Sequence, residues 1–266
     1  MTTQPEDDPA PPQAPARNVL YRSENLLVFG VQQFHSRSVV ITFCSREAQP
    51  TLERPGFGEG FLINYGIDAI HIICSDNSWY QYDDIYAALD AAVAHSASYA
   101  NKVAMGWSMG GYAAVNFSEY LGVDRVIAVS PQFSADPTKV PLETRWRRDR
   151  RRINFRHDLI HTFARGVRQF CIVFDDRHAL DRHHVERIKE WVDIVELPLP
   201  HSGHPAGSLL ASLGILATTI TRLIEGTFDR DEFATQMRKL AGAGGSPYRR
   251  LARRIGRSLF KPPTGR

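Results

Sequence analysis

The sequence predicts an α/β domain with a mostly parallel central sheet and helices on both of its faces. Short apolar runs typical of buried strands alternate with longer segments whose apolar residues repeat at helical spacing. Such alternation is typical of parallel strands joined by crossing helices. The chain has 266 residues, 43% of them hydrophobic, which is enough for one domain with a complete core.

The individual elements follow from the same patterns. Apolar runs predict strands at residues 26–30, 38–44, 68–74, 102–107, 126–131, 169–174 and 193–198. The first two are separated by a polar turn and are expected to form an antiparallel pair. Helical spacing predicts helices at 84–95, 109–121, 181–191, 209–224 and 230–240. Asp181 is expected to be the N-cap of the third helix.

Three segments fall outside this alternation. Residues 1–17 are rich in Pro, Ala and acidic side chains and are predicted to be disordered, which leaves 18–240 as the domain. Residues 132–165 carry seven arginines between positions 145 and 156, so we expect an insertion or a partial lid there. Residues 241–266 are predicted to be a flexible linker and a basic amphipathic tail, with apolar residues on one helical stripe at Leu251, Ile255 and Leu259.

A Gly-x-Ser-x-Gly motif is centred on Ser108, between an apolar strand and a helix that opens with small residues. A serine on such a sharp turn takes a strained backbone conformation that lifts its hydroxyl above the sheet edge. Strand and helix then lie so close that the positions two before and two after the serine require glycine. Gly106 and Gly110 meet that requirement, so the motif predicts a serine nucleophile.

Acidic and basic side chains follow two later predicted strands. Asp175 and Asp176 come directly after one strand, and His201 and His204 follow the next. A hydroxyl is a poor nucleophile at its ordinary pKa and needs an adjacent base, which in turn needs an orienting acid. These side chains therefore offer Ser108 candidate bases and candidate acids for nucleophilic catalysis.

With these residues the chain resembles the α/β-hydrolase superfamily over about residues 26–224. The resemblance implies the α/β-hydrolase fold and a triad in the chain order Ser, Asp or Glu, His. It favours His204 over His201 as the base, because the superfamily's histidine typically follows a glycine and precedes a helix. For the acid we expect Asp175, with Asp176 as the close alternative.

The resemblance also implies an oxyanion hole. In the superfamily one donor is the N–H after the nucleophile, here that of Met109, and the second comes from the loop after an early strand, here Ser45. The His-Gly-Gly-Gly loop of the lipase and esterase branch is absent from the sequence. Trp79 and Tyr80 lie in a loop expected beside Ser108, where they either line an acyl- or sugar-binding cleft or cover the sheet edge.

The predicted function is a serine hydrolase that cleaves an ester or thioester through an acyl-enzyme on Ser108. Two alternatives stay open: an acyltransferase with the same triad, and a hydrolase-fold binding module for anionic polymers or membrane surfaces. No cofactor is expected, because the sequence lacks nucleotide-binding and HExxH motifs. No metal site is expected, since histidines at a helix start, such as His178, His183 and His184, are more often solvated.

The expected substrate is a small-molecule, glycan or lipid ester, and an anionic one if the arginine segment covers Ser108. The basic tail favours contact with an anionic membrane surface, a solvated tail or a packed helix, and no specific nucleic-acid partner is expected. Cys44, Cys74 and Cys171 show no metal-like spacing, which is typical of a reducing compartment. Lacking a signal peptide and a membrane-length apolar run, the protein is predicted to be cytoplasmic, or peripheral to the membrane through its tail.

Overall fold

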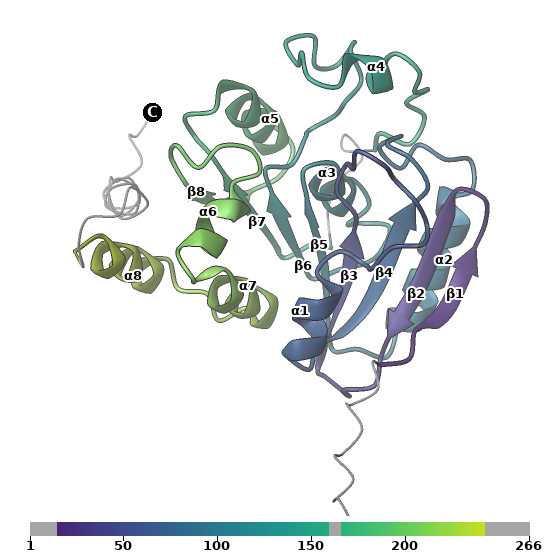
Figure 1. Ribbon diagram of the computed structural model, residues 1–266, viewed down its shortest axis with the longest axis horizontal. Coiled ribbons are helices and arrows are strands. Elements are labelled where there is room, and N and C mark those ends of the chain that lie inside the picture. Colours follow the sequence, from purple (N-terminus) through teal and green to yellow (C-terminus); the bar gives the residue numbers. More distant parts are fainter. Residues whose placement is uncertain (1–14, 160–165, 243–266) are drawn as a thin grey trace, which may run out of the picture.

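A computed structural model describes residues 15–159 and 166–242, and in them the strands form one eight-stranded sheet (Figure 1). The strand order is β1-β2-β4-β3-β5-β6-β7-β8. The strands are β1 (Asn18–Arg22), β2 (Leu26–Val31), β3 (Ser38–Phe43), β4 (Asp68–Cys74), β5 (Asn101–Trp107), β6 (Arg125–Val129), β7 (Gln169–Phe174) and β8 (Ile194–Pro198). The predicted α/β class and its mostly parallel sheet are confirmed.

The first strands are arranged differently from the prediction. The antiparallel pair expected from residues 26–30 and 38–44 is wrong, because β2 pairs antiparallel with β4 instead. Strand β3 lies between β4 and β5 and runs parallel to both. Its side chains from Val39 to Phe43 are all buried, as expected of a strand covered on both faces. Strand β1, which the sequence patterns missed, pairs antiparallel with β2 at the sheet edge.

Helices cover both faces of the sheet. The helices are α1 (Glu59–Asn64), α2 (Ile85–Ser96), α3 (Met109–Asn116), α4 (Arg147–Arg150), α5 (Ala179–Lys189), α6 (Gly207–Ser212), α7 (Leu216–Glu225) and α8 (Arg230–Gly242). Alternate residues of β5 pack on opposite sides, Ala104 with α2, α3 and α5, and Met105 with α1 and α7. Helices α6 and α8 pack on the end of the sheet formed by β6, β7 and β8.

Three helical predictions need correction. The helix expected at 209–224 is two helices, because Gly214 between α6 and α7 has a φ of 71° and ends the first of them. Helix α1 lies in a stretch for which no helix was predicted. The N-cap of α5 is His178 rather than Asp181, since the His178 ring accepts a hydrogen bond from the Asp181 N–H at 3.2 Å.

Residues 130–168, called the β6–β7 segment below, contain α4 and irregular chain where the structure describes them. Asp158, which is buried, accepts hydrogen bonds from the Tyr112 hydroxyl of α3 at 3.1 Å and from Ser134 at 2.7 Å. The buried Arg150 donates to the carbonyl groups of Ala135 and Val140, and Arg46 pairs with Asp149 at 2.8 Å. The described part of the segment is therefore held against α3 and the loop after β3.

The arginines of this segment do not act as one cluster. Arg145 and Arg150 are drawn into the protein, and Arg156 pairs with Asp83. Five members are exposed, namely Arg147, Arg148, Arg151, Arg152 and Arg156 itself. The predicted insertion over 132–165 is thus anchored by internal contacts in its described part, while residues 160–165 lie outside the described chain.

The ends of the chain are only partly described. Arg17 makes a two-pronged ion pair with Glu59 of α1, at 2.7 and 2.9 Å, so the disorder predicted for residues 1–17 does not extend to it. The prediction of disorder for residues 1–14, and that of an apolar stripe at Leu251, Ile255 and Leu259 in a basic tail, lie outside the described residues. Across residues 15–159 and 166–242, no helix is long and apolar enough to cross a membrane.

Candidate active site

Ser108 lies on the turn between β5 and α3, with a φ of 52° and a ψ of −119°. Such a positive φ is strained for a residue with a side chain and needs support from its surroundings. The support is close packing of strand, turn and helix. A Cβ on Gly106 would lie 2.2 Å from the Gly110 carbonyl oxygen, and one on Gly110 would lie 2.3 Å from that of Phe43. Both glycines are therefore required where the motif placed them.

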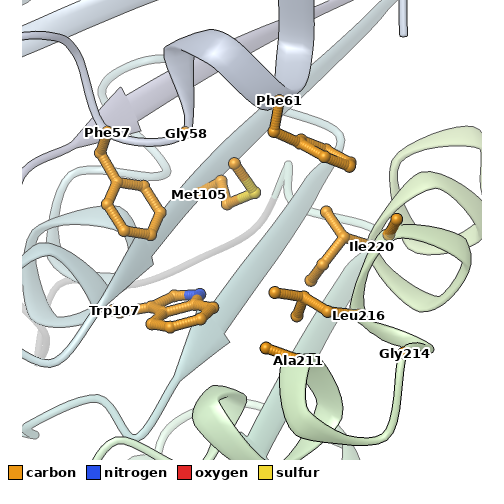
Figure 2. Close-up of a pocket in the computed structure, with 10 residues that line it drawn as sticks. Phe57, Gly58, Phe61, Met105, Trp107, Ala211, Gly214, Leu216 and Ile220 are labelled. Carbon is orange, nitrogen blue, oxygen red and sulfur yellow. The ribbon is translucent and has the colours of Figure 1, made fainter. Parts of the chain in front are cut away.

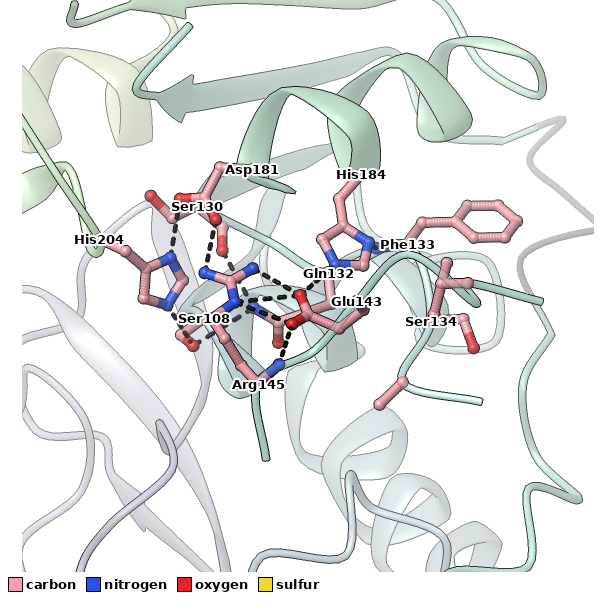
Figure 3. Close-up of polar contacts among 12 residues, drawn as sticks. Ser108, Ser130, Gln132, Phe133, Ser134, Glu143, Arg145, Asp181, His184 and His204 are labelled. Carbon is pink, nitrogen blue, oxygen red and sulfur yellow. Dashed lines mark hydrogen bonds and ion pairs between the residues drawn. The ribbon is translucent and has the colours of Figure 1, made fainter. Parts of the chain in front are cut away.

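A continuous chain of hydrogen bonds joins Ser108 to His204 and Asp181 (Figure 3). The Ser108 Oγ lies 2.9 Å from His204 Nε2, and His204 Nδ1 lies 2.7 Å from Asp181 Oδ2. The carboxylate fixes the tautomer: Nδ1–H donates to Asp181, which leaves Nε2 to accept the serine proton. Ser108 is 6% exposed and Asp181 only 1%. The chain is thus well shielded from water.

The structure corrects the expected acid. Asp175 does not contact the His204 ring; its carboxylate accepts the backbone N–H groups of Arg177, His201 and Gly203 at 2.9, 2.8 and 2.9 Å. It fixes the loop that carries His204. The acid beside the ring is Asp181, in the first turn of α5, where the sequence suggested a helix cap. The alternatives Asp176 and His201 take no part in the hydrogen bonds that join Ser108, His204 and Asp181. Asp176 is 3.7 Å from Arg177, and the His201 side chain is exposed.

Gln132, at the start of the β6–β7 segment, contacts the Ser108 hydroxyl and was not predicted. Its Oε1 accepts a hydrogen bond from the Trp79 indole at 3.2 Å. An indole N–H can only donate, so this contact orients the amide with Nε2 toward Ser108 Oγ, 3.3 Å away. The oxygen that accepts from Gln132 is then free to donate its own proton to His204.

Trp79 and Tyr80 do not line a cleft, contrary to one of the two readings of their loop. Both side chains are fully buried. The Tyr80 hydroxyl donates to the Cys44 carbonyl at 3.0 Å, and its ring packs edge-on against Phe43. Trp79 packs on Trp146, whose ring centroid lies 5.8 Å from that of His204. The two aromatics therefore support the site from within the core.

Beyond Asp181 the polar chain continues into the β6–β7 segment. Arg145 donates to Asp181 Oδ1 at 2.8 Å and to Glu143 at 2.7 Å. Glu143 also lies 3.0 Å from His184 Nε2 on α5. The Arg145 guanidinium is stacked 4.5 Å over the Trp146 ring. None of these partners was predicted, because the arginine run gave no sign that one of its members turns inward.

The environment shifts the protonation of these groups. Burial alone would raise the pKa of Asp181, but the hydrogen bond from His204 and the charge of Arg145 outweigh it and hold that pKa below its ordinary value. The pKa of Glu143 is likewise lowered, since contacts with His184 and Arg145 overcome burial. Burial lowers the pKa of His184, which favours its neutral form. The site thus contains two carboxylates and one guanidinium.

The two residues expected to supply the oxyanion hole lie beside Ser108. Met109 begins α3, so its N–H is one of the first-turn donors that have no acceptor within a helix. The Ser45 hydroxyl donates to the carbonyl oxygen of Trp107, the residue before Ser108, at 3.0 Å. Ser45 therefore lies at the sheet edge next to the turn. Its role, like that of Met109, stays a prediction.

An apolar pocket of about 400 Å³ lies on the face of the sheet covered by α1, α6 and α7 (Figure 2). Its wall includes Phe57, Met105, Trp107, Leu216 and Ile220. Trp107 is the lining residue nearest in the chain to Ser108. In the part of the chain that the structure describes, neither Ser108 nor His204 belongs to this wall. The pocket therefore lies beside the hydrogen-bonded chain, not at it.

The histidines that were weighed as metal ligands have other surroundings. His178 caps α5, and His184 is bonded to Glu143 and to the Phe133 N–H. Within residues 15–159 and 166–242, no group of three or more His, Cys, Asp or Glu side chains is arranged to hold a metal ion.

Comparisons with known proteins agree with this geometry at the level of the fold. The capsule O-acetyltransferase of Neisseria meningitidis serogroup A has a TM-score of 0.54 at 10% identity, covering 77% of this chain and 93% of its own. Alpha/beta hydrolase domain-containing protein 10 from mouse has a TM-score of 0.52 at 14% identity, covering 80% and 100%. XC6422 from Xanthomonas campestris, an α/β serine hydrolase without a lid, has a TM-score of 0.50 at 16% identity, covering 82% and 98%.

At these identities the similarity to solved structures concerns the fold alone. No curated protein matches the sequence. The family comparison is more extensive, because residues 46–260 match the alpha/beta hydrolase family. That match covers most of the 266 residues, from the loop after β3 to beyond α8, and the chain therefore belongs to the alpha/beta hydrolase family.

Proposed function

We propose that the protein is a serine hydrolase that cleaves an ester or thioester through an acyl-enzyme on Ser108. The single observation that supports this most is the unbroken chain from Ser108 Oγ through His204 to Asp181, at 2.9 and 2.7 Å. These lengths are within the range for direct proton transfer between a nucleophile, its base and an orienting acid.

The geometry supports the following sequence of proton movements. As Ser108 Oγ attacks the carbonyl carbon, its proton passes to His204 Nε2, while Asp181 keeps the ring in place and balances the new positive charge. The Met109 N–H and, in this proposal, the Ser45 N–H donate hydrogen bonds to the carbonyl oxygen as it gains negative charge. His204 then gives its proton to the leaving oxygen or sulfur. In the second half, His204 takes a proton from the attacking water, and the bond between the acyl carbon and Ser108 Oγ then breaks as His204 returns the proton to Oγ.

An acyltransferase differs only in the second half of this sequence. An alcohol in place of water would receive the acyl group from Ser108, with His204 again taking the proton. Supplying alcohols of increasing size to the acyl-enzyme and measuring the products therefore distinguishes a hydrolase from an acyltransferase. A hydrolase releases free acid at a rate that the alcohols leave unchanged, whereas an acyltransferase forms mainly the new ester.

The first experiment is labelling with a fluorophosphonate probe. Wild type should be labelled, Ser108→Ala should not be, and His204→Ala should react at least about 100-fold more slowly because it lacks the base. His201→Asn is the matched control. It changes a histidine of the same loop whose side chain is exposed, and Asn tolerates the positive φ of 64° there. It should be labelled like wild type.

Limited access must be separated from lack of reactivity, because Ser108 is only 6% exposed. A small sulfonyl fluoride used beside the long-chain probe makes this distinction. If folded wild type reacts with neither reagent, the proposal is wrong. If it reacts with the small reagent alone, the serine is activated and the entrance selects small acyl groups.

A further inference from the structure

The hydrogen-bonded chain does not end at Asp181. Its second oxygen, Oδ1, accepts from Arg145 at 2.8 Å while Oδ2 accepts from His204. The other side of the guanidinium binds Glu143, through Nε at 3.0 Å and through a second nitrogen at 2.7 Å. Figure 3 shows Arg145 lying between the two carboxylates. A buried serine–histidine–acid chain is thus extended by an ion pair from another part of the sequence.

Burial and packing hold both residues of this ion pair in place. The side chain of Glu143 is fully buried and that of Arg145 is 20% exposed. Trp146 packs under the guanidinium at 4.5 Å and approaches the His204 ring at 5.8 Å. Arg145 therefore has little freedom to swing into solvent, and its charge stays next to Asp181.

His184 is bonded to Glu143 without neutralising it. Its Nδ1 accepts the N–H of Phe133 at 3.2 Å, so the proton of the neutral ring must be on Nε2, which donates to Glu143 at 3.0 Å. Burial lowers the pKa of His184 and favours that neutral state. Arg145 is then the cation that balances Glu143, and it is shared with Asp181.

The charges around His204 follow from this assignment. With His184 and His204 both neutral, the two carboxylates of Asp181 and Glu143 and the guanidinium of Arg145 together carry one net negative charge. When His204 accepts the serine proton, the group becomes neutral. Because the groups are shielded from water, a change of one charge here alters the stability of the protonated ring far more than it would at the surface.

We propose that Arg145 and Glu143 are positioning residues of the site. Together they hold Asp181 in place, and their charges determine how strongly the surroundings stabilise the protonated ring of His204. This inference rests on the proposed function, since it assigns a role within that reaction. It makes opposite predictions for the two residues. Removing the cation leaves an excess of negative charge that favours protonated His204, whereas removing the Glu143 carboxylate has the reverse effect.

Other groups near His204 must be distinguished from this pair. By element, the titratable and charged groups around it are Asp181 and His178 on α5, Arg145 and Glu143 in the β6–β7 segment, Asp175 after β7, and His201 in its own loop. His178→Asn keeps an acceptor for the N-cap and removes the imidazole ring whose centroid lies 6.2 Å from that of His204. It controls for a contribution of His178 to any measured titration.

The test compares wild type, Arg145→Gln, Arg145→Lys, Glu143→Gln and the double variant Glu143→Gln/Arg145→Gln. The readouts are the acidic limb of the kcat/KM profile against pH and the NMR titration of the His204 ring. Arg145→Gln should move both to higher pH by about one unit, a typical effect of a neighbouring charge. Glu143→Gln should move both to lower pH by a smaller amount.

Two of these variants separate the effect of charge from that of packing, and one added variant is a control. Arg145→Lys keeps the charge and should stay close to wild type, and the double variant, which removes both charges, should return toward it. Arg148→Gln removes an exposed arginine of the same helix region and should change nothing. Glu143→Gln and the double variant remain informative if Arg145→Gln, which leaves a buried carboxylate unpaired, does not fold.

The outcomes are distinct. Shifts of opposite sign with rescue by lysine support the proposal. Shifts of the same sign, no shift in folded variants, or a lysine variant that behaves like the glutamine one would overturn it. The NMR titration does not depend on turnover, so it still tests the charge relationship if wild type proves unreactive toward the probes. In that case the proposed function fails, and the two failures are told apart.

Discussion

Asp181 and His204 lie 23 positions apart and are joined by a 2.7 Å hydrogen bond between Oδ2 and Nδ1. The carboxylate of Asp175, six residues before Asp181, accepts hydrogen bonds from backbone N–H groups of the loop that carries His204. Two aspartates therefore divide the support of one histidine. Asp175 fixes where the loop lies, and Asp181 fixes how the ring is turned and which nitrogen carries the proton. This division leads to the first prediction.

Asp181→Asn should lower kcat/KM about 10³- to 10⁴-fold, because an amide can donate to Nδ1 and stabilise the wrong tautomer of His204. Asp175→Asn should instead act mainly on stability. Its amide accepts fewer of the three N–H groups, and losing one or two charge-assisted bonds costs about 2–3 kcal/mol. For both variants, kcat/KM measures the loss of activity and urea unfolding measures the loss of stability.

The contrast between the two variants is decisive. If Asp175→Asn were the inactive, stable variant and Asp181→Asn the active one, the assignment of the acid would be reversed. If both lost activity only in proportion to lost folded protein, neither carboxylate would have a specific part in the reaction.

Ser108 and the neighbourhood of His204 could be predicted because their signals are local. Gly106 and Gly110 are required by the contact of strand and helix, and that requirement is visible in a five-residue motif. Asp181 could not be identified as the partner of His204, because its position relative to the histidine depends on where α5 begins. His178 takes the capping position, and only then does Asp181 in the first turn face the histidine loop. Moving the N-cap by three residues, from Asp181 to His178, therefore changes Asp181 from a helix cap to the partner of His204.

Gln132, Glu143 and Arg145 were missed for a different reason. They lie in a segment without periodicity, where neither a helical stripe nor strand alternation indicates which side chains turn inward. The sheet order at β2, β3 and β4 was missed for a similar reason, since pairing partners depend on contacts between distant residues. Local patterns therefore gave most of the elements and the sharp turn at Ser108, whereas the groups that surround this serine come from tertiary packing.

A second prediction concerns the hydrogen bond from Gln132 to Ser108. Gln132→Met keeps the size of the side chain and removes the donor, so kcat/KM should fall about tenfold, the effect of one hydrogen bond of about 1.4 kcal/mol. Trp79→Phe removes the indole N–H that orients the amide and should cause a smaller loss. Full activity in a folded Gln132→Met variant would show that the serine hydroxyl needs no orientation from this side.

A third prediction tests the packing beneath the turn. Gly110→Ala should lower the free energy of unfolding by about 3 kcal/mol or more, because the new Cβ would lie 2.3 Å from the Phe43 carbonyl oxygen. Gly60→Ala in α1 is the matched control, since a Cβ there meets nothing within 4 Å. Alanine favours a helix over glycine by up to about 1 kcal/mol, so this control should be as stable as wild type or more so. Urea unfolding measures both; equal stabilities would contradict the close contact of α3 and β3.

The last prediction concerns pH and a buried histidine away from the site. His71 on β4 is fully buried, and its Nδ1 lies 2.6 Å from the Thr42 hydroxyl. Burial lowers the pKa of His71 to about 4; the charge of Glu59 opposes this to a smaller extent, and that of Arg17 adds to it. In the unfolded chain a histidine has a pKa of about 6.5. Between these two values the unfolded chain binds a proton that the folded protein does not.

Stability should therefore fall as the pH drops from about 6.5 toward 4, and remain insensitive to His71 above that range. At pH 5 the contribution of this histidine amounts to a loss of about 2 kcal/mol, because each unit below 6.5 is worth about 1.4 kcal/mol. The measurement is the difference in unfolding free energy between pH 7.5 and pH 5.0. In His71→Gln that difference should be smaller by about 2 kcal/mol, whatever the variant's absolute stability. His95→Gln, which changes an exposed histidine on α2, should keep the wild-type difference. An unchanged difference in His71→Gln would mean that the His71 ring takes up its proton in the folded protein as readily as in the unfolded chain, which its burial argues against.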